Sequence, residues 1–159
     1  MSEIKNKPAN SRYFPGRLAM PLNTEHLNRC IQTLELSLES LRKSEPGSIE
    51  YEVFRNATIK GFELTLEVSG KLLRKVLKPF FATPKTVDAL VFKDLFRYAA
   101  RHGICSTDEV QRWLKYRDNR NNTAHDYGAG FAEETLLLLP DLIADARSLM
   151  NKLGNVAGN

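Results

Sequence analysis

The sequence predicts an all-α protein, an antiparallel up-and-down bundle of four to five helices. Apolar residues recur three and four positions apart along most of the chain, which is the period of one face of a helix. Proline, glycine and cap residues interrupt this pattern at a few points, and the alternation typical of strands does not occur. With 159 residues and a hydrophobic content of 42%, the chain is long and apolar enough for one domain with a buried core.

Two long helices are expected first. Asn23 and Thr24 are a plausible cap for the first, and the Glu-Pro-Gly-Ser segment at 45–48 ends it. The second should run from about Ile49 to Leu77, because Pro79 stops it. A short turn between long helices makes them pack antiparallel. The expected buried stripes are Leu27, Cys30, Ile31, Leu34, Leu38 and Leu41, followed by Phe54, Ala57, Gly61, Leu64, Val68, Leu72 and Val76.

The third predicted helix opens at the Thr-Pro-Lys-Thr segment 83–86 and closes at Gly103. A last helix should run from about Phe131 to Leu153, after the Gly-Ala-Gly segment 128–130, and Pro140 should kink it or mark a restart. The expected buried face of the third helix is Val87, Leu90, Val91, Leu95, Tyr98 and Ala99, and that of the last is Leu142, Ile143, Ala146, Leu149, Met150 and Leu153.

The fourth predicted helix, capped by the Ser-Thr-Asp segment 106–108, changes character along its length. Its stripe begins with Val110, Trp113 and Leu114. The same spacing then gives Arg117, Asn121 and His125, so that the face turns from apolar to polar. Buried polar groups need hydrogen-bond partners, and we therefore expect this face to bind a ligand or to meet a second copy of the chain.

Residues 1–23 are expected to be a flexible basic tail, 24–153 the helical bundle and 154–159 a short C-terminal tail. The first segment carries four basic residues against Glu3 alone, so an RNA-binding arm is the alternative to a frayed terminus. A net charge of +4 permits an RNA or nucleotide partner without requiring one. Neither the polar start at 1–7 nor the short apolar run at 136–139 suits a signal peptide or a membrane span, so we expect a cytoplasmic protein without membrane contact.

The two cysteines offer one alternative site. Each lies within one helical turn of a histidine, and the set His26, Cys30, His102 and Cys105 has the residue types of a zinc site. Against this, Cys30 falls on an apolar stripe, and buried thiols are the ordinary outcome in a reducing compartment. We therefore expect neither a metal nor a cofactor.

The segment Arg120–Tyr127 is the most informative part of the sequence. Arginine is a permanent cation with the geometry to hold phosphate, and histidine transfers protons near neutral pH. Together, Arg120, Asn121 and His125 form a plausible set of catalytic residues for phosphodiester cleavage. The alternative is an ordinary helix end at which arginine and asparagine bind free carbonyl groups and the histidine lies on the surface.

The surrounding residues separate these alternatives. Arg120, Asn121, His125 and Tyr127 match the motif Arg-Asn-x-x-x-His-x-Tyr, in which the segment resembles the HEPN superfamily and most closely its HepT-type, nucleotidyltransferase substrate-binding branch. The Gly-Phe-Glu-Leu-Thr-Leu-Glu segment 61–67 is similar to the Phe-Glu-rich helix of that branch. The resemblance covers roughly residues 24–153 and leaves the basic tail outside.

The resemblance implies a homodimer in which two such motifs meet, and a small nucleotidyltransferase as partner. It further implies a metal-independent ribonuclease toxin whose antitoxin partner, in some pairs, adds AMP to the tyrosine that matches Tyr127. An older view makes the helical protein the non-catalytic substrate-binding or nucleotide-binding subunit of a two-subunit nucleotidyltransferase. A purely structural bundle is the third possibility.

Two further residues are candidates for binding. Glu63 can reach across the bundle to orient Arg120 or Arg117, or it can pair with Lys60 in its own helix. Arg117 is a second cation near the motif, for which a salt bridge to Asp118 or Asp126 is the ordinary expectation.

Overall fold

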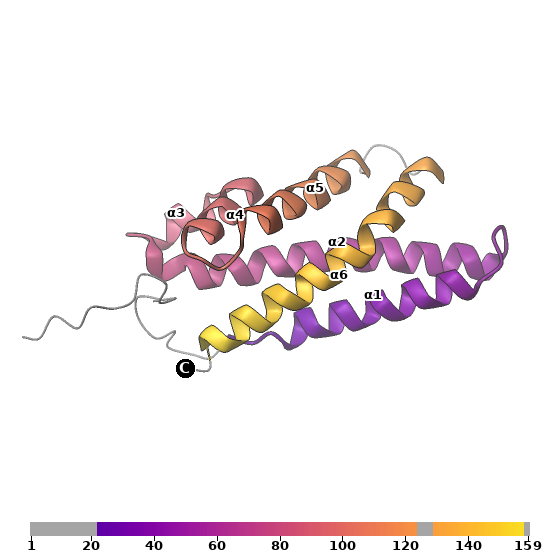
Figure 1. Ribbon diagram of the computed structural model, residues 1–159, viewed down its shortest axis with the longest axis horizontal. Coiled ribbons are helices and arrows are strands. Elements are labelled where there is room, and N and C mark those ends of the chain that lie inside the picture. Colours follow the sequence, from indigo (N-terminus) through magenta and orange to yellow (C-terminus); the bar gives the residue numbers. More distant parts are fainter. Residues whose placement is uncertain (1–21, 124–128, 158–159) are drawn as a thin grey trace, which may run out of the picture.

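The computed structural model describes residues 22–123 and 129–157, and every regular element in these ranges is helical (Figure 1). The all-α prediction is confirmed. The elements are α1 (Glu25–Lys43), α2 (Ile49–Leu77), the short 3-10 helix η1 (Lys78–Phe80), α3 (Pro84–Asp88), α4 (Phe92–Arg101), α5 (Thr107–Thr123) and α6 (Ala129–Ala157).

Helices α1 and α2 form a long antiparallel pair. Ser48 caps α2 by accepting a hydrogen bond from the Tyr51 amide at 3.1 Å, and Gly47 before it takes the left-handed conformation with φ +87°. All six residues predicted for the buried stripe of α1 are buried. The prediction for this stripe is correct because, within the part of the chain that the structure describes, α1 packs mainly against α2 and α6 and buries one face.

Helix α2 is the centre of the molecule. Figure 1 shows α1 along one side of α2, α4 and α5 along the other, and α6 crossing over the pair. The predicted stripe of α2 is therefore incomplete: Ala57 is exposed, whereas Phe62, Leu66 and Leu73 are buried without having been predicted. A helix that contacts α1, α3, α4, α5 and α6 has more than one buried face, and a single-stripe interpretation underestimates it.

The third predicted helix is wrong as a single element, because the chain breaks between α3 and α4. Val91 is extended, with φ −74° and ψ 159°, and is 61% exposed rather than buried. The guanidinium group of Arg74 on α2 donates hydrogen bonds to the carbonyl oxygens of Val87 and Leu90. A long-range partner thus satisfies the carbonyl groups that a continuous helix would have paired internally.

Helix α6 continues through Pro140, so of the two predicted alternatives, a kink or a restart, the restart does not occur. Proline removes only one helical hydrogen bond, and the exposed Pro140 is flanked by the fully buried Leu139 and Leu142, which anchor the helix on both sides. The helix also begins at Ala129 and extends to Ala157, beyond the predicted bounds at both ends.

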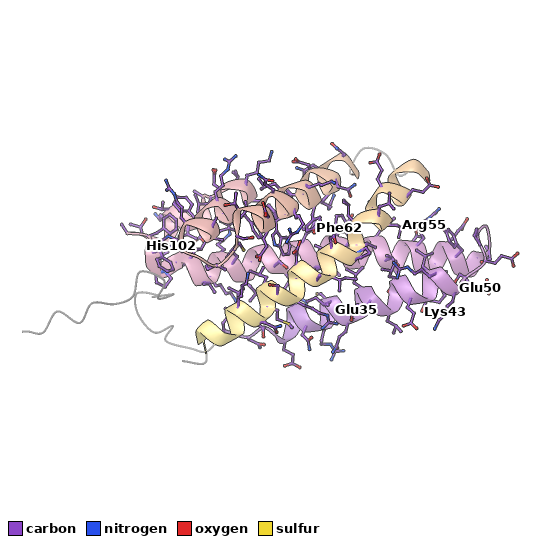
Figure 2. The ribbon with its side chains drawn as sticks, in the orientation of Figure 1. Glu35, Lys43, Glu50, Arg55, Phe62 and His102 are labelled. Atoms are coloured by element: carbon purple, nitrogen blue, oxygen red, sulfur yellow. The ribbon has the colours of Figure 1, made fainter. Side chains whose placement is uncertain are left out.

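The core is continuous across the bundle. Trp113 stacks on Phe96 with ring centroids 4.9 Å apart, which joins α5 to α4. Figure 2 shows Phe62 near the middle of α2, and His102 at the opposite end of the molecule from Lys43 and Glu50, which flank the α1–α2 turn. Among the described helices, none is long and apolar enough to cross a membrane.

Candidate functional site

The structure describes half of the predicted motif. Arg120 and Asn121 lie in the last turns of α5. His125 and Tyr127 lie outside the described residues, as does Asp126, so their roles remain predictions.

Arg120 faces α2, where it meets Glu63. Its Nε lies 3.6 Å from Glu63 Oε1, and the two side chains are 32% and 19% exposed. Glu63 Oε2 also lies 3.7 Å from Lys60 Nζ, so both pairings expected from the sequence occur together. At these separations the carboxylate attracts the two cations without forming short hydrogen bonds. Glu63 thus orients Arg120, and among the described residues it leaves the guanidinium donors of Arg120 available for an anion.

Asn121 is exposed and does not continue the core-facing stripe of α5, which corrects the predicted face. The core side of α5 instead runs through Val110, Trp113 and Tyr116 to Asn119. Asn119 Oδ1 accepts a hydrogen bond at 3.0 Å from the buried Thr135 hydroxyl of α6. The core-facing stripe of α5 therefore does become polar after Trp113, as predicted. It continues at Tyr116, three residues later, rather than at Arg117, four residues later, and Thr135 of α6 is a partner of Asn119.

Arg117 lies over an aromatic ring. Its guanidinium carbon is 5.3 Å from the centroid of Phe92, the first residue of α4, which is a cation–π distance. Of the two carboxylates expected to pair with Arg117, Asp118 instead lies 3.5 Å from Lys93, and Asp126 lies outside the described residues. Arg117 thus presents a positively charged plane beside Arg120.

These residues share one groove, of about 630 Å³, between α2, α5 and the turn that leads into α4. Among the described residues, its lining includes five cationic side chains and two carboxylates, an excess of three positive charges. Its apolar floor includes Leu66, Phe92 and Leu95. The cations are Lys60, Lys71, Arg74, Arg117 and Arg120, and the carboxylates are Glu63 and Glu67.

The five cations are not equally available to a ligand. Arg74 is occupied by the carbonyl oxygens of Val87 and Leu90, and Lys71 Nζ lies 2.9 Å from Glu67 Oε1 in an exposed pair. Exposed pairs of this kind are weak and exchange readily with a stronger anion. A phosphate group in the groove would therefore meet Lys60, Lys71, Arg117 and Arg120. Sequence reasoning missed Lys71 and Phe92, although the sequence does show charges repeating along one face of α2 at residues 60, 63, 67 and 71.

A buried polar network holds α5 against α6. The carboxylate of Asp145 accepts two hydrogen bonds from Arg112, both at 2.8 Å, and one from the Tyr116 hydroxyl at 2.6 Å. Burial, followed by the hydrogen bond to Asp145, raises the pKa of Tyr116 above its ordinary value. The sequence carried a signal for this network, because Asp145 falls on the apolar stripe of the last helix, where a charge needs a partner.

The alternative zinc set does not come together. In residues 22–123 and 129–157, no group of three or more histidine, cysteine, aspartate or glutamate side chains is suited to a metal ion. Burial raises the pKa of the Cys105 thiol to about 12 and also raises the pKa of Cys30. His102 stacks on Phe80 with ring centroids 3.9 Å apart, and burial lowers its pKa. These residues pack as side chains of the fold.

Comparison with known proteins identifies the family. A family model described as "nucleotidyltransferase substrate binding protein like" matches residues 22–155. The chain belongs to this family. The match spans the groove and the whole motif from Arg120 to Tyr127, and it confirms the resemblance inferred from those residues.

Individual relatives agree with this assignment. The chain is 25% identical, over 136 residues, to a protein of Haemophilus influenzae named probable ribonuclease HepT, and the alignment covers 83% of this chain and 92% of that protein. The structure of HI0074 from Haemophilus influenzae, described as the fold of a substrate binding domain of a nucleotidyltransferase, superimposes with a TM-score of 0.71. It is 25% identical, and 82% of this chain and 98% of that chain are covered. A protein from Thermus thermophilus shares the fold at a TM-score of 0.62 and 24% identity, with 80% and 98% covered.

Proposed function

We propose that this protein is the HEPN-type helical subunit of a pair with a small nucleotidyltransferase, and that it is a metal-independent ribonuclease, the toxin of that pair. One observation carries most of the weight: Arg120, the arginine of the motif, lies on a groove with an excess of positive charge and is oriented there by Glu63. The similarity to a protein named probable ribonuclease HepT supports the same function.

The reaction we propose is an internal transesterification of RNA. The 2′-hydroxyl oxygen forms a bond to the adjacent phosphorus, and the bond from phosphorus to the 5′-oxygen breaks, leaving a cyclic phosphate and a free 5′-hydroxyl. Arg120 stabilises the negative charge that grows on the non-bridging oxygens. Asn121, exposed beside it, positions the phosphate.

His125 transfers the protons in this proposal. A neutral imidazole takes the proton of the 2′-hydroxyl, and a protonated imidazole supplies one to the leaving 5′-oxygen. One motif offers one histidine, so the proposal includes a homodimer in which the two motifs face each other. Tyr127 is the proposed acceptor of AMP from the nucleotidyltransferase, which would bring negative charge next to Arg120 and compete with RNA.

The test is cleavage of RNA by the purified protein in the presence of EDTA. Arg120→Ala and His125→Ala should each lower the rate by about 10²- to 10⁴-fold at unchanged thermal stability. Arg97→Ala is the matched control, because Arg97 is an exposed arginine of α4 that pairs with Asp94 outside the groove. Wild-type cleavage that His125→Ala retains in full would refute the catalytic role.

A second candidate is a non-catalytic subunit that binds a nucleotide or another substrate for the nucleotidyltransferase. The apolar floor of the groove favours it, because ligand sites commonly combine an apolar lining with a few polar groups. Absence of cleavage by the wild-type protein, together with tight co-purification with the nucleotidyltransferase, would favour this function over the ribonuclease.

A further inference from the structure

Helix α2 contains two buried glycines with different surroundings. At Gly61, a Cβ atom would lie 3.2–3.3 Å from Leu34, including its backbone Cα, so the close approach of α1 requires glycine there. At Gly70, a Cβ atom would meet only the ring of Phe92, at 3.5 and 3.6 Å, which is ordinary van der Waals contact. Glycine inside a helix costs about 1 kcal/mol relative to alanine. Packing within the described chain therefore explains Gly61 and does not explain Gly70.

Gly70 lies on the wall of the basic groove, next to its aromatic group. The Phe92 ring packs on Phe96 with centroids 4.7 Å apart, and Arg117 lies over it. The break between α3 and α4, which Arg74 holds, sets Phe92 in this position. The result is a packed aromatic ring with a planar cation over it, beside one helical position without a side chain.

We propose that this part of the groove binds one nucleotide of single-stranded RNA, with its base stacked on the Phe92–Arg117 pair next to Gly70. Bases stack on aromatic rings and on arginine planes, and RNA-binding proteins combine such platforms with cationic grooves. Lys71, next to Gly70, is the cation for the phosphate of this nucleotide. The inference rests on the proposed function, because it assigns the groove to the RNA that Arg120 would contact.

The geometry favours a nucleotide adjacent to the one that is cleaved. Gly70 follows Glu63 by seven residues, or about 10 Å along the axis of α2. Glu63 orients Arg120, so the stacking platform lies beside the proposed position of the scissile phosphate without overlapping it. The excess of positive charge along the groove suits a polyanion better than an apolar peptide.

The test measures binding separately from cleavage. A fluorescently labelled single-stranded oligoribonucleotide with 2′-O-methyl groups at every sugar binds without being cleaved, because the 2′-hydroxyl nucleophile is blocked. Phe92→Leu keeps the apolar volume and removes the ring, and it should weaken binding by about 5- to 100-fold, as expected for the loss of one base–aromatic stack. Phe81→Leu is the control, since Phe81 packs against Tyr98 and is absent from the lining of the groove.

Gly70 supplies an independent variant. Gly70→Leu places a large side chain against the Phe92 ring, where it competes with the base, and should weaken binding at least as much as Phe92→Leu. Gly70→Ala should keep or raise the melting temperature, because alanine fits and favours the helix. A clear fall in the melting temperature of Gly70→Ala would mean that packing requires this glycine, and would overturn the inference.

The outcomes separate this inference from the proposed function. Weaker oligonucleotide binding in both Phe92→Leu and Gly70→Leu, with no cleavage by the wild type, would support the RNA platform and refute the ribonuclease. Cleavage by the wild type, with unchanged oligonucleotide binding in both variants, would support the ribonuclease and refute the RNA platform. Binding of AMP alone as tightly as the oligonucleotide would overturn the assignment of the groove to RNA and make it a mononucleotide site.

Discussion

The two long sides of α2 are built for different purposes. On the side of α1, Leu34 approaches Gly61 closely and is itself fully buried. On the side of α4 and α5, a groove lies between the helices, and charged side chains gather around it. The same helix thus has one glycine that the approach of α1 requires, and a second at which a Cβ atom would make only ordinary contact with the Phe92 ring. The two glycines are the same residue type, so residue type alone does not indicate a binding site. A glycine that packing does not require can indicate one.

The largest expected effect is on the packed side. Leu34→Ala should lower the free energy of unfolding by about 2–5 kcal/mol, because it removes a fully buried side chain and leaves a cavity between α1 and α2. Urea unfolding followed by circular dichroism measures this. Leu36→Ala on the same helix is the control, since Leu36 is 65% exposed, and it should change stability by less than about 0.5 kcal/mol. Equal effects of the two substitutions would contradict the assignment of the packed face.

An intermediate effect should come from the glycine of the packed side. Gly61→Ala should destabilise the protein by about 1–3 kcal/mol, because the added methyl group pushes against Leu34, including its backbone. The sign is opposite to that expected for Gly70→Ala, so thermal unfolding of the two variants compares the two sides directly. The loss should shrink in the Leu34→Ala background, because the contact with Leu34 Cδ1 is gone. A stabilising Gly61→Ala would remove the contrast between the glycines.

The smallest effect concerns the network that holds α5, one wall of the groove. The pKa of Tyr116 is raised in the folded protein, so its contribution to stability is complete below its unfolded pKa, near 10, and is lost as the pH rises above that value. Tyr116→Phe should cost about 1 kcal/mol at neutral pH through the lost hydrogen bond to Asp145. It should also flatten the decline of stability above pH 10, measured by denaturant unfolding at several pH values. Parallel pH profiles for the wild type and Tyr116→Phe would show that Tyr116 does not couple folding to pH.

Some elements were predictable because their signals lie among neighbours in the sequence. The stripe of α1 was read correctly because one face alone is buried. The end of α2 at Leu77 was also correct, since proline at position 79 acts locally. The residue types and spacing of the segment from Arg120 to Tyr127 were enough to recognise the family. For Glu63, the sequence left two partners open, and the structure shows that both Arg120 and Lys60 lie within ion-pair distance.

Other elements depended on distant residues. The break between α3 and α4 is stabilised by Arg74, which is distant in the sequence. The apolar residues around Val91 follow a continuous helical pattern and do not indicate the break. On α5, positions three and four after Trp113 are equally compatible with a helical stripe, so periodicity could not choose between Tyr116 and Arg117. The hydrogen bond to the carboxylate of Asp145 on α6 places Tyr116 on the buried face. With α5 in this rotation, Arg117 lies over Phe92.

By itself, the sequence determined the helical class, the antiparallel pair at its start and the family motif, because helical periodicity, caps and turn residues act over a few positions. Only the tertiary structure decided that Glu63, Phe92, Arg117 and Arg120 line one groove. These residues come from three helices, and their distances depend on how each helix is rotated and how closely it approaches α2. Side chains such as Leu34, Arg74 and Asp145, which act from far away in the sequence, set that rotation and spacing.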